Sequence, residues 1–193
     1  MSPAVVILAG GQGERIGGNK PSRLLAGERL VDRALRLARS WSDVVAVAVR
    51  DPDQVEQVNA AIIRDDPAIA GPLAGLVSAL RFAAAAERDL VLTIPTDMPF
   101  LPLDLLDRLE SAIVDRACAI AGSGGHRHPV CGLWRTGALD SIEDYLAGER
   151  RSLMGFAGLV GFGEVDWLAQ PSDPFLNINS PAELARAERL ARA

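Results

Sequence analysis

Short apolar runs alternate with amphipathic segments over the first two thirds of the chain. Runs rich in Val, Ile and Leu predict buried strands at residues 4–9, 44–49, 61–63 and 89–94. Apolar residues at helical spacing predict helices at 29–39, 72–86 and 101–116, with a weaker one at 54–60. In the 101–116 helix, the residues expected to face the core are Leu103, Leu106, Leu109 and Ile113. This alternation of strands and helices predicts a parallel sheet with right-handed crossovers.

The last third of the chain is less regular. We expect strands at 118–121, 128–135, 163–168 and 175–178, and helices at 138–146, 152–159 and 181–192. The final helix begins with a capping box, because Glu183 follows Ser180 by three residues and Pro181 takes the first helical position. Since no repeat, low-complexity segment or linker interrupts the chain, we expect one α/β domain over residues 1–193. It should be built on a mostly parallel, Rossmann-like sheet.

Composition limits the kinds of partner and the cellular compartment that we expect for this protein. The 193 residues are 49% hydrophobic and 23% charged, as is usual for a soluble globular protein. A formal net charge of −5 provides no broad basic surface, so we expect binding neither to nucleic acid nor to an anionic membrane. Cys118 and Cys131 cannot form a disulfide framework, and neither a signal-peptide pattern nor a membrane-length apolar run is visible. We therefore expect a cytoplasmic protein.

A glycine-rich stretch follows the first predicted strand, where ligands commonly bind in open α/β sheets. It contains glycines at positions 10, 11, 13, 17 and 18 together with the cations Arg15 and Lys20. Glycines let backbone N–H groups approach a phosphate, and cations neutralise its charge. Neither common phosphate loop fits, because Asn19 stands at the lysine position of the P-loop and Ile16 at the last glycine of the dinucleotide fingerprint. The stretch predicts a phosphate-binding loop of another kind.

Asp97 is the best candidate for a metal ligand. It follows the predicted strand at 89–94 and stands between Pro95 and Pro99, so its carboxylate should point into the crevice at the end of the sheet. Mg²⁺ is usually held by one or two such carboxylates together with substrate phosphates. An aspartate in this context can also be a helix N-cap or a turn residue.

Five separated segments resemble one family. LAGGxxxRxGGxK, from Leu8 to Lys20, and PTDMPF at 95–100 are similar to signatures of nucleotidyltransferases that activate a sugar or cofactor phosphate with an NTP. GPLAG at 71–75, HPV at 128–130 and NIN at 177–179 narrow the resemblance to the molybdenum cofactor guanylyltransferase family. The resemblance implies the fold of the nucleotide-diphospho-sugar transferases, with helices on both faces of the sheet.

The resemblance also implies an activity. It implies an enzyme that transfers GMP from GTP to the terminal phosphate of molybdopterin or molybdenum cofactor and releases pyrophosphate, with Mg²⁺ as cofactor. Transient contact with molybdoenzymes or their chaperones would be compatible with this role. The nearest alternative is a cytidylyltransferase of the same cofactor or another NTP-dependent nucleotidyltransferase, and relatives that use CTP tend to have LAAG where this chain has LAGG. A non-catalytic nucleotide-binding or chaperone-like protein is a further alternative, against which Lys20 and Asp97 argue.

Residue roles follow from the same resemblance. It implies catalytic roles for Lys20, Arg15 and Asp97, with Asp97 also as the metal ligand. The residues it implies in nucleotide binding are Leu8, Ala9, Gly10, Gly11, Lys20, Asp65, Gly71, Gly75, Asp97, Asn177 and Asn179.

Three positions leave alternatives open. The family usually has two residues between the second glycine pair and the lysine, whereas one residue precedes Lys20 here, so Arg23 could help with the phosphate. Asp65 has Asp66 beside it, which leaves the register of the nucleotide-holding aspartate undecided, and both also suit a turn. Val47 stands where the family offers an asparagine near the base.

Two further groups of residues have competing interpretations. The histidines and cysteines of the chain are Cys118, His126, His128 and Cys131. Their spacing lacks the paired CxxC of structural zinc sites, so we do not expect zinc; HPV instead resembles the family's stretch near the pterin acceptor. Arg150 and Arg151 resemble a binding site for the acceptor's phosphate, but equally suit a solvated turn.

Overall fold

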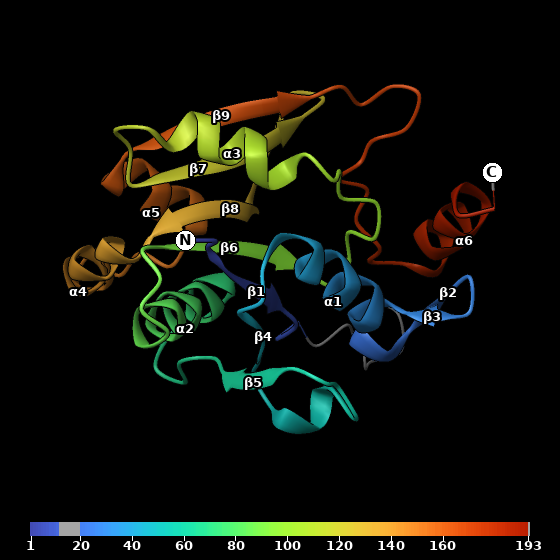
Figure 1. Cartoon of the computed structure of the whole chain (residues 1–193), viewed down its shortest axis with the longest axis horizontal. Coiled ribbons are helices and arrows are strands. Elements are labelled where there is room, and N and C mark those ends of the chain that lie inside the picture. The colour runs from blue at the N-terminus through green and yellow to red at the C-terminus, as the bar shows by residue number, and fades with distance from the viewer. Residues whose placement is uncertain (12–19, 193) are drawn as a thin grey trace.

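The computed structural model describes residues 1–11 and 20–192, and its centre is a seven-stranded sheet (Figure 1). From edge to edge the strand order is β5-β4-β1-β6-β8-β7-β9. The strands are β1 Ala4–Leu8, β4 Val45–Val49, β5 Ala61–Arg64, β6 Leu90–Pro95, β7 Cys118–Ser123, β8 His126–Arg135 and β9 Phe162–Trp167. In this sheet β8 pairs antiparallel with β6 and β7, and the other pairs are parallel. The predicted mostly parallel α/β sheet is confirmed.

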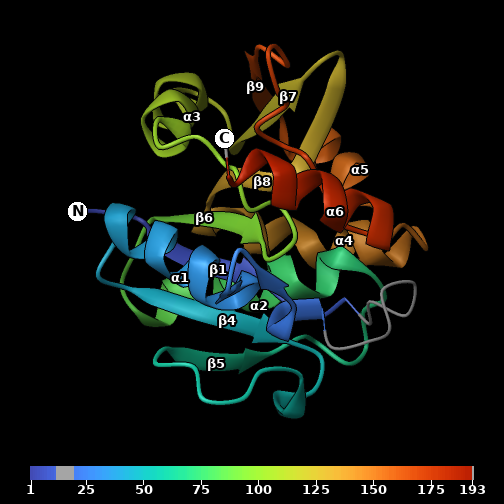
Figure 2. The same cartoon turned by 90° about the vertical axis from the view of Figure 1, so that its right-hand side faces the viewer.

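Helices cover both faces of this sheet, as expected (Figure 2). One face packs against α1 (Leu30–Trp41) and α3 (Leu105–Ile113). The other packs against α2 (Pro72–Ala85), α4 (Ile142–Ala147) and α5 (Leu153–Val160). Alternate residues of β1 enter the two cores: Val5 and Ile7 join the first, Ala4 and Val6 the second. Because side chains alternate along a strand, a fully apolar strand is what a sheet covered on both faces requires.

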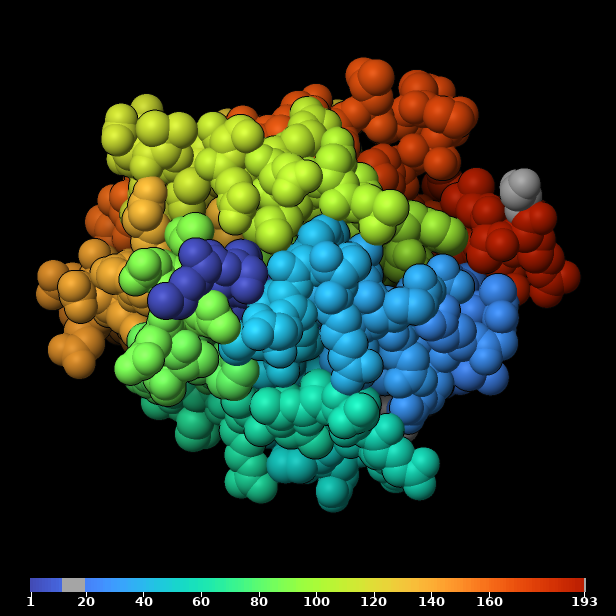
Figure 3. Space-filling view, in the orientation of Figure 1, coloured from blue at the N-terminus to red at the C-terminus, as the bar shows by residue number. Residues whose placement is uncertain are grey.

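A third, smaller core ties the end of the described chain to the segment after residue 20. The hairpin of β2 (Leu24–Leu25) and β3 (Glu28–Arg29) packs beside α6 (Pro181–Leu190), as the neighbouring surfaces in Figure 3 show. Leu25, Leu30, Ile178 and Ala187 are buried together there. The predicted N-cap is present, because the Ser180 hydroxyl accepts from the Glu183 N–H. The Glu183 carboxylate turns back toward the cap, where it accepts from the Ser180 hydroxyl and from the Asn179 N–H one residue before it.

Two short segments differ from the prediction. The weak helix expected at 54–60 is wrong: a 3₁₀ turn, η3 (Pro52–Gln54), ends at the first residue of that segment, and Asp51 and Gln54 cap the turn reciprocally. The segment was too short and too polar to bury a helical face, so local capping decided its structure. The connection expected at 21–27 overlaps the 3₁₀ turn η2 (Lys20–Ser22) and contains β2 of the hairpin, whose second strand, β3, follows it.

Later in the chain, the strand expected at 175–178 is also wrong. This segment has no strand partner, and Phe175 and Ile178 are buried as separate anchors. The helix expected at 138–146 begins as a 3₁₀ segment, η4 (Thr136–Ser141), before α4. Apolar residues alone could not distinguish these cases, because a strand also needs a free sheet edge beside it.

The boundary of α3 corrects one predicted core residue. The helix begins at Leu105, four residues later than expected, and Leu103 is 74% exposed before it. Leu105, which is 0% exposed, joins the core instead. No helix in the described part of the chain combines the length and apolar character needed to cross a membrane.

Alanine substitutions of Leu103 and Leu105 should change the stability of the protein by different amounts. Leu105→Ala should lower the free energy of unfolding by about 2–5 kcal/mol, because it leaves a cavity in the core. Leu103→Ala should change it by less than about 0.5 kcal/mol, because the side chain is exposed. Urea unfolding of both variants measures the difference, and equal losses would contradict the position of α3.

Candidate active site

A hollow of about 210 Å³ lies where β1 and β4–β6 end and α2 begins. It is lined by Leu8, Gly10, Gly11, Arg50, Asp65, Gly71, Pro72, Gly75, Pro95 and Val130. Six residues expected to bind the nucleotide are among them: Leu8, Gly10, Gly11, Asp65, Gly71 and Gly75. They meet because carboxyl ends of neighbouring parallel strands share one edge of the sheet.

Asp65 is the polar centre of the hollow, and two glycines make room for it. A Cβ on Gly10 would overlap the Asp65 Oδ2 atom, and a Cβ on Gly75 would lie 3.3 Å from its Oδ1 atom and 3.0 Å from Leu8 Cδ2. The Oδ1 atom is buried and has no hydrogen-bond partner among the described residues. Burial raises the pKa of Asp65, and the nearby positive charge of Arg50 partly opposes that rise. The Asp65 Oδ1 atom is therefore a buried hydrogen-bond acceptor that a donor on a bound ligand could satisfy.

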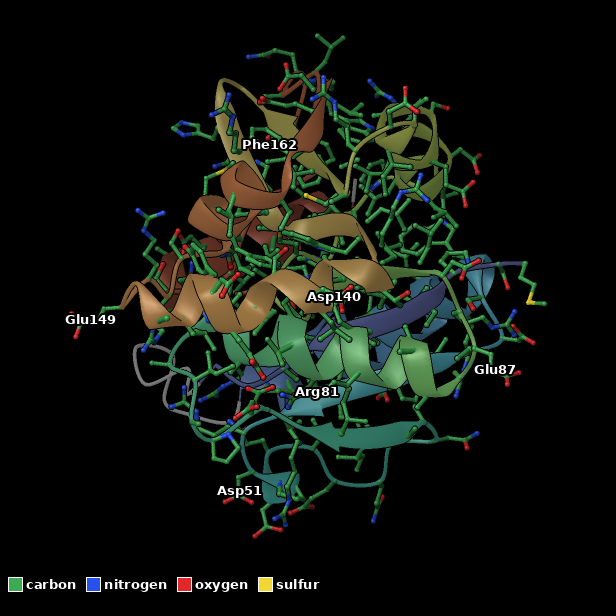
Figure 4. All side chains as sticks on the ribbon, turned by 90° about the vertical axis from the view of Figure 1, so that its left-hand side faces the viewer. Asp51, Arg81, Glu87, Asp140, Glu149 and Phe162 are labelled. Atoms are coloured by element: carbon green, nitrogen blue, oxygen red, sulfur yellow. The ribbon has the colours of Figure 1, made fainter. Side chains whose placement is uncertain are left out.

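Asp66 has a different environment. Its carboxylate pairs with Arg81 of α2 at 2.7 Å and accepts from the Ala68 N–H at 3.0 Å. Arg81 lies on the side of α2 that faces β5, as Figure 4 shows. These hydrogen bonds hold the pKa of Asp66 below its usual range. Asp65, not Asp66, thus lines the hollow.

Beyond Pro95, a second cluster gathers Lys20, Asp97 and Asn179 from three distant parts of the chain. The Lys20 ammonium, whose residue is 8% exposed, donates to Asp97 Oδ2 and, at 2.6 Å, to Asn179 Oδ1. The Ile178 N–H donates to the Asp97 carbonyl at 2.9 Å and fixes the late segment against the turn after β6. Asp97 Oδ1 is buried and has no partner among the described residues. The sheet edge therefore carries a cation, a carboxylate and an amide in contact.

The segment that carries the two asparagines is held by an aromatic and polar contact with the β7–β8 hairpin. Phe175 stacks on His128 at 4.8 Å between ring centroids. The Ser123 hydroxyl donates to Asp173 Oδ1 at 2.9 Å and lies 2.8 Å from His128 Nε2. Burial lowers the pKa of His128, an effect that Asp173 opposes. These contacts position the chain that continues to Asn177, whose own Oδ1 atom is buried and unpartnered among the described residues.

Other predicted residues lie elsewhere. Arg15 lies outside the described residues. Ala9 is buried in the core, where its N–H donates to the Ala48 carbonyl, and it does not line the hollow. Val47 is also fully buried in that core. The Arg23 N–H closes the η2 turn by donating to the Lys20 carbonyl.

The turn with Arg150 and Arg151 is exposed, and Figure 4 shows Glu149 at the far end of α4, pointing away from the sheet. Arg151 donates to the carbonyls of Leu146 and Arg150, which matches the structural interpretation of this turn. Cys118 and Cys131 are buried, and burial raises the pKa of the Cys118 thiol to about 12. The described residues contain no group of three or more His, Cys, Asp and Glu side chains placed to hold a metal.

Four residues of the hollow were not among the predicted site residues: Arg50, Pro72, Pro95 and Val130. Pro72, Pro95 and Val130 belong to the GPLAG, PTDMPF and HPV segments, whereas Arg50 lies outside every motif. Arg50 carried a usable signal, because it directly follows a buried parallel strand, as Gly10 and Asp97 do. Val130 belongs to the HPV motif, but its place in the hollow depends on an irregularity in the β7–β8 pairing that the sequence did not indicate.

The two parts of the site suit two parts of one ligand. A mostly apolar hollow with one unpartnered carboxylate accepts a flat, donor-bearing group, and Lys20 beside it accepts an anion. A nucleoside phosphate has both. Asp97 and the amide oxygens offer the hard oxygen ligands that Mg²⁺ prefers.

Comparison with known proteins agrees with this chemistry. Residues 5–159 match the family model described as the MobA-like NTP transferase domain. The molybdenum cofactor guanylyltransferase of Cereibacter sphaeroides (strain ATCC 17029 / ATH 2.4.9) is 39% identical over 189 residues, which cover 97% of this chain and 96% of that protein. The chain belongs to the molybdenum cofactor guanylyltransferase family.

Solved structures resemble the whole fold. Molybdopterin-guanine dinucleotide biosynthesis protein A from Archaeoglobus fulgidus has a TM-score of 0.78 and 25% identity, with 98% of both chains covered. The 2-C-methyl-D-erythritol 4-phosphate cytidylyltransferase of Thermus thermophilus has a TM-score of 0.73 at 21% identity over both full chains, a likeness of fold alone. The expected nucleotidyltransferase fold is confirmed.

For this member of the guanylyltransferase family, Asp65→Asn should raise thermal stability at neutral pH. Burial raises the pKa of Asp65 above its unfolded value of about 3.9, so the folded state binds the proton more tightly. Stability therefore falls as the pH rises from about 4 through the raised pKa, so the ionised carboxylate carries a penalty at higher pH. The variant should melt higher at pH 7, by about 2–4 °C for each kcal/mol recovered, and match the wild type near pH 3.

Asp66→Asn is the matched control and should act in the opposite direction. The pKa of Asp66 is lowered by Arg81, so its contribution is present at neutral pH and is lost as the pH falls below about 4. This variant should melt lower than the wild type at pH 7. Calorimetry at pH 7 and pH 3 compares the pair, and shifts of the same sign at pH 7 would contradict the environments described.

Proposed function

We propose that this protein transfers GMP from GTP to the terminal phosphate of molybdopterin or molybdenum cofactor and releases pyrophosphate. The observation that carries the proposal is the contact of Lys20 with Asp97 beside the hollow that holds Asp65. One ligand with a base at one end and phosphates at the other would satisfy both. The identity and full coverage shared with the guanylyltransferase of Cereibacter sphaeroides support the same reaction.

In this reaction an oxygen of the acceptor phosphate attacks the α-phosphorus of GTP, and the bond to pyrophosphate breaks. The protein must bring two anions together and neutralise the leaving group. The Lys20 ammonium would move from Asp97 to the nucleotide phosphates. During this movement the Asn179 Oδ1 atom would go on accepting one of the ammonium N–H bonds and so help to orient the lysine. Backbone at Gly10 and Gly11 can approach the phosphates closely, and we propose Arg15 as a second cation.

The residues present fit Mg²⁺ as the cofactor. Asp97 Oδ1 is a buried carboxylate oxygen without a partner among the described residues, which is the state expected of an unsatisfied metal ligand. Asp97 would hold the ion, with substrate phosphates as the other anionic ligands. When bound, Mg²⁺ would neutralise charge on the triphosphate during transfer. Release of Lys20 from Asp97 would free the second carboxylate oxygen for the same purpose.

We also propose the wider setting implied by this reaction. The chain would work as one domain over residues 1–193 in the cytoplasm and pass its product to molybdoenzymes or their chaperones. The net charge of −5 supports binding of the anionic substrates by local cations such as Lys20 and not by a broad positive field.

GTP, rather than CTP, is the nucleotide this proposal requires. The direct test is a thermal shift with each nucleotide and Mg²⁺, followed by measurement of pyrophosphate release from GTP with molybdenum cofactor. Specific binding stabilises the native state by mass action. An equal or larger shift with CTP would overturn the choice of GTP and leave the nucleotidyl transfer itself standing.

Gly10→Ala should weaken GTP binding by displacing Asp65. The added Cβ would overlap Asp65 Oδ2, so the carboxylate must leave its slot between Gly10 and Gly75. We expect the dissociation constant for GTP to rise about tenfold or more and that for CTP to change less, because loss of one hydrogen bond to a charged group is worth about 1.5–3 kcal/mol. Gly137→Ala, at a site where an added Cβ meets nothing within 4 Å, is the control. Calorimetric titration with both nucleotides decides the outcome; equal losses for GTP and CTP would contradict a role of Asp65 in base choice.

Asp97→Asn should nearly abolish guanylyl transfer while the protein remains folded. The change removes one negative charge and preserves shape, so transfer should fall roughly a hundredfold or more when metal-borne charge stabilisation is lost. Asp107→Asn makes the same change on the exposed side of α3 and should leave the rate near wild type. Pyrophosphate release over a Mg²⁺ titration measures the effect. Normal activity of Asp97→Asn at low Mg²⁺ would remove Asp97 from the proposed metal site.

A further inference from the structure

Arg50 is the cation that lines the hollow together with Asp65, and its side chain has no partner among the residues that the structure describes. It directly follows β4 and lines the hollow together with Asp65. Both residues also line an adjoining groove of about 430 Å³ beside residues 66–70. The Arg50 N–H is bound to Gln54 Oε1 at 2.9 Å, which holds the backbone in place. Among the described residues, the guanidinium itself makes no hydrogen bond or ion pair. Its five N–H donors are therefore unpaired within the described part of the chain.

The order of the strands decides which end of a nucleotide meets Arg50. Asp97 follows β6, Gly10 follows β1, Arg50 follows β4 and Asp65 follows β5, and these strands are consecutive in the sheet. Neighbouring strands are about 4.8 Å apart, so about 14 Å separate the outer two strands. If the phosphates lie with Lys20 at the β6 end, the base must lie toward β4 and β5. Arg50 and Asp65 then face the base.

We propose that Arg50 is a specificity-determining residue that reads guanine, with Asp65 as its complement. The proposal rests on the function proposed above. The guanidinium would donate to the O6 and N7 acceptors of guanine, the pairing that arginine makes most often with this base. Asp65, whose buried Oδ1 atom has no donor in the part of the chain that the structure describes, would accept from the adjacent N1–H and 2-amino groups. Donors and acceptors on two neighbouring edges of guanine would thus be matched by one cation and one anion.

The same arrangement disfavours other bases. Adenine presents an amino donor where guanine has O6, so a donor would face the Arg50 guanidinium. Adenine also lacks the paired N1–H and amino donors that Asp65 requires. Cytosine places an amino donor on the corresponding edge and is too small to reach both residues at once. Arg50 and Asp65 would therefore select guanine because any other base leaves some of their hydrogen-bonding groups unpaired, which is an effective way to reject a wrong ligand.

The test compares nucleotides that each lack one recognised group. Dissociation constants for GTP, 7-deaza-GTP, ITP and ATP are measured by calorimetric titration with Mg²⁺ and no acceptor. The proteins are wild type, Arg50→Ala, Arg50→Lys and Asp65→Asn. Arg64→Ala is the matched control, because it removes the same charge from an exposed residue beside Asp65 that does not line the hollow. Melting curves without nucleotide confirm that each variant is folded.

Arg50→Ala should weaken GTP binding about 10- to 100-fold and ATP binding little. The wild type should bind 7-deaza-GTP, which lacks N7, more weakly than GTP, and Arg50→Ala should lose that preference. Arg50→Lys should recover only part of the loss, because an ammonium cannot make the two parallel hydrogen bonds of a guanidinium. ITP lacks the 2-amino group, so its penalty should persist in Arg50→Ala and vanish in Asp65→Asn. Arg64→Ala should bind all four nucleotides as the wild type does.

Three results would overturn the inference. Unchanged GTP binding by Arg50→Ala would exclude any contact with the nucleotide. Equal losses for GTP and ATP in Arg50→Ala would assign Arg50 to the phosphates or ribose and not to the base. An equal loss in Arg64→Ala would reduce the effect to general charge. In each of these cases GTP still binds the wild type, so the proposed function stands; absence of GTP binding by the wild type would overturn both.

Discussion

The contact of Lys20 with Asp97 and Asn179 is the interaction on which the site depends, because it joins three segments that no local structure connects. Asp97 is delivered by a buried parallel strand, Lys20 by a one-turn helix, and Asn179 by the cap of α6. Before a nucleotide binds, the cation compensates a partly buried carboxylate, which would otherwise carry a desolvation cost. The same three groups are those that a triphosphate and its metal require. In the free protein, the Lys20–Asp97 ion pair thus satisfies the same charged groups that would contact the substrate and its metal.

The hollow beside this pair differs, because the burial of its carboxylate is only partly offset by the nearby charge of Arg50. Asp65 sits between Gly10 and Gly75 with one buried oxygen that no described residue contacts by a hydrogen bond, and burial raises its pKa. Such a group lowers stability in the free protein and becomes favourable when a donor enters. The contrast with Asp66, which is paired with Arg81, gives the two adjacent aspartates opposite roles. It also supplies a physical reason for LAGG in a protein of this family: a Cβ at position 10 would take the space of the Asp65 carboxylate.

Much of this protein could be predicted from its sequence alone. Buried strands such as residues 4–9 and 89–94 are continuous apolar runs, and their alternation with helices sufficed for the parallel sheet covered on both faces. Because ligands bind at the carboxyl ends of such strands, the glycine-rich stretch and Asp97 were recognisable as site residues. The cap at Ser180 and Glu183 was readable too, since its geometry depends on neighbours only three residues apart.

What only the tertiary structure decided are contacts between residues far apart in sequence. Two adjacent aspartates look alike in a sequence, and burial against Gly10 and Gly75 is what distinguishes Asp65. Arg50 gave no motif, and the order β5-β4-β1-β6 placed it beside that carboxylate. Residues 175–178 have the composition of a strand, yet they pair with no strand of the described chain, and Phe175 and Ile178 are buried as separate anchors. The sequence determined which elements form because hydrophobic period and capping are local; strand order and burial are set by packing of the whole chain, and these decide which side chains meet.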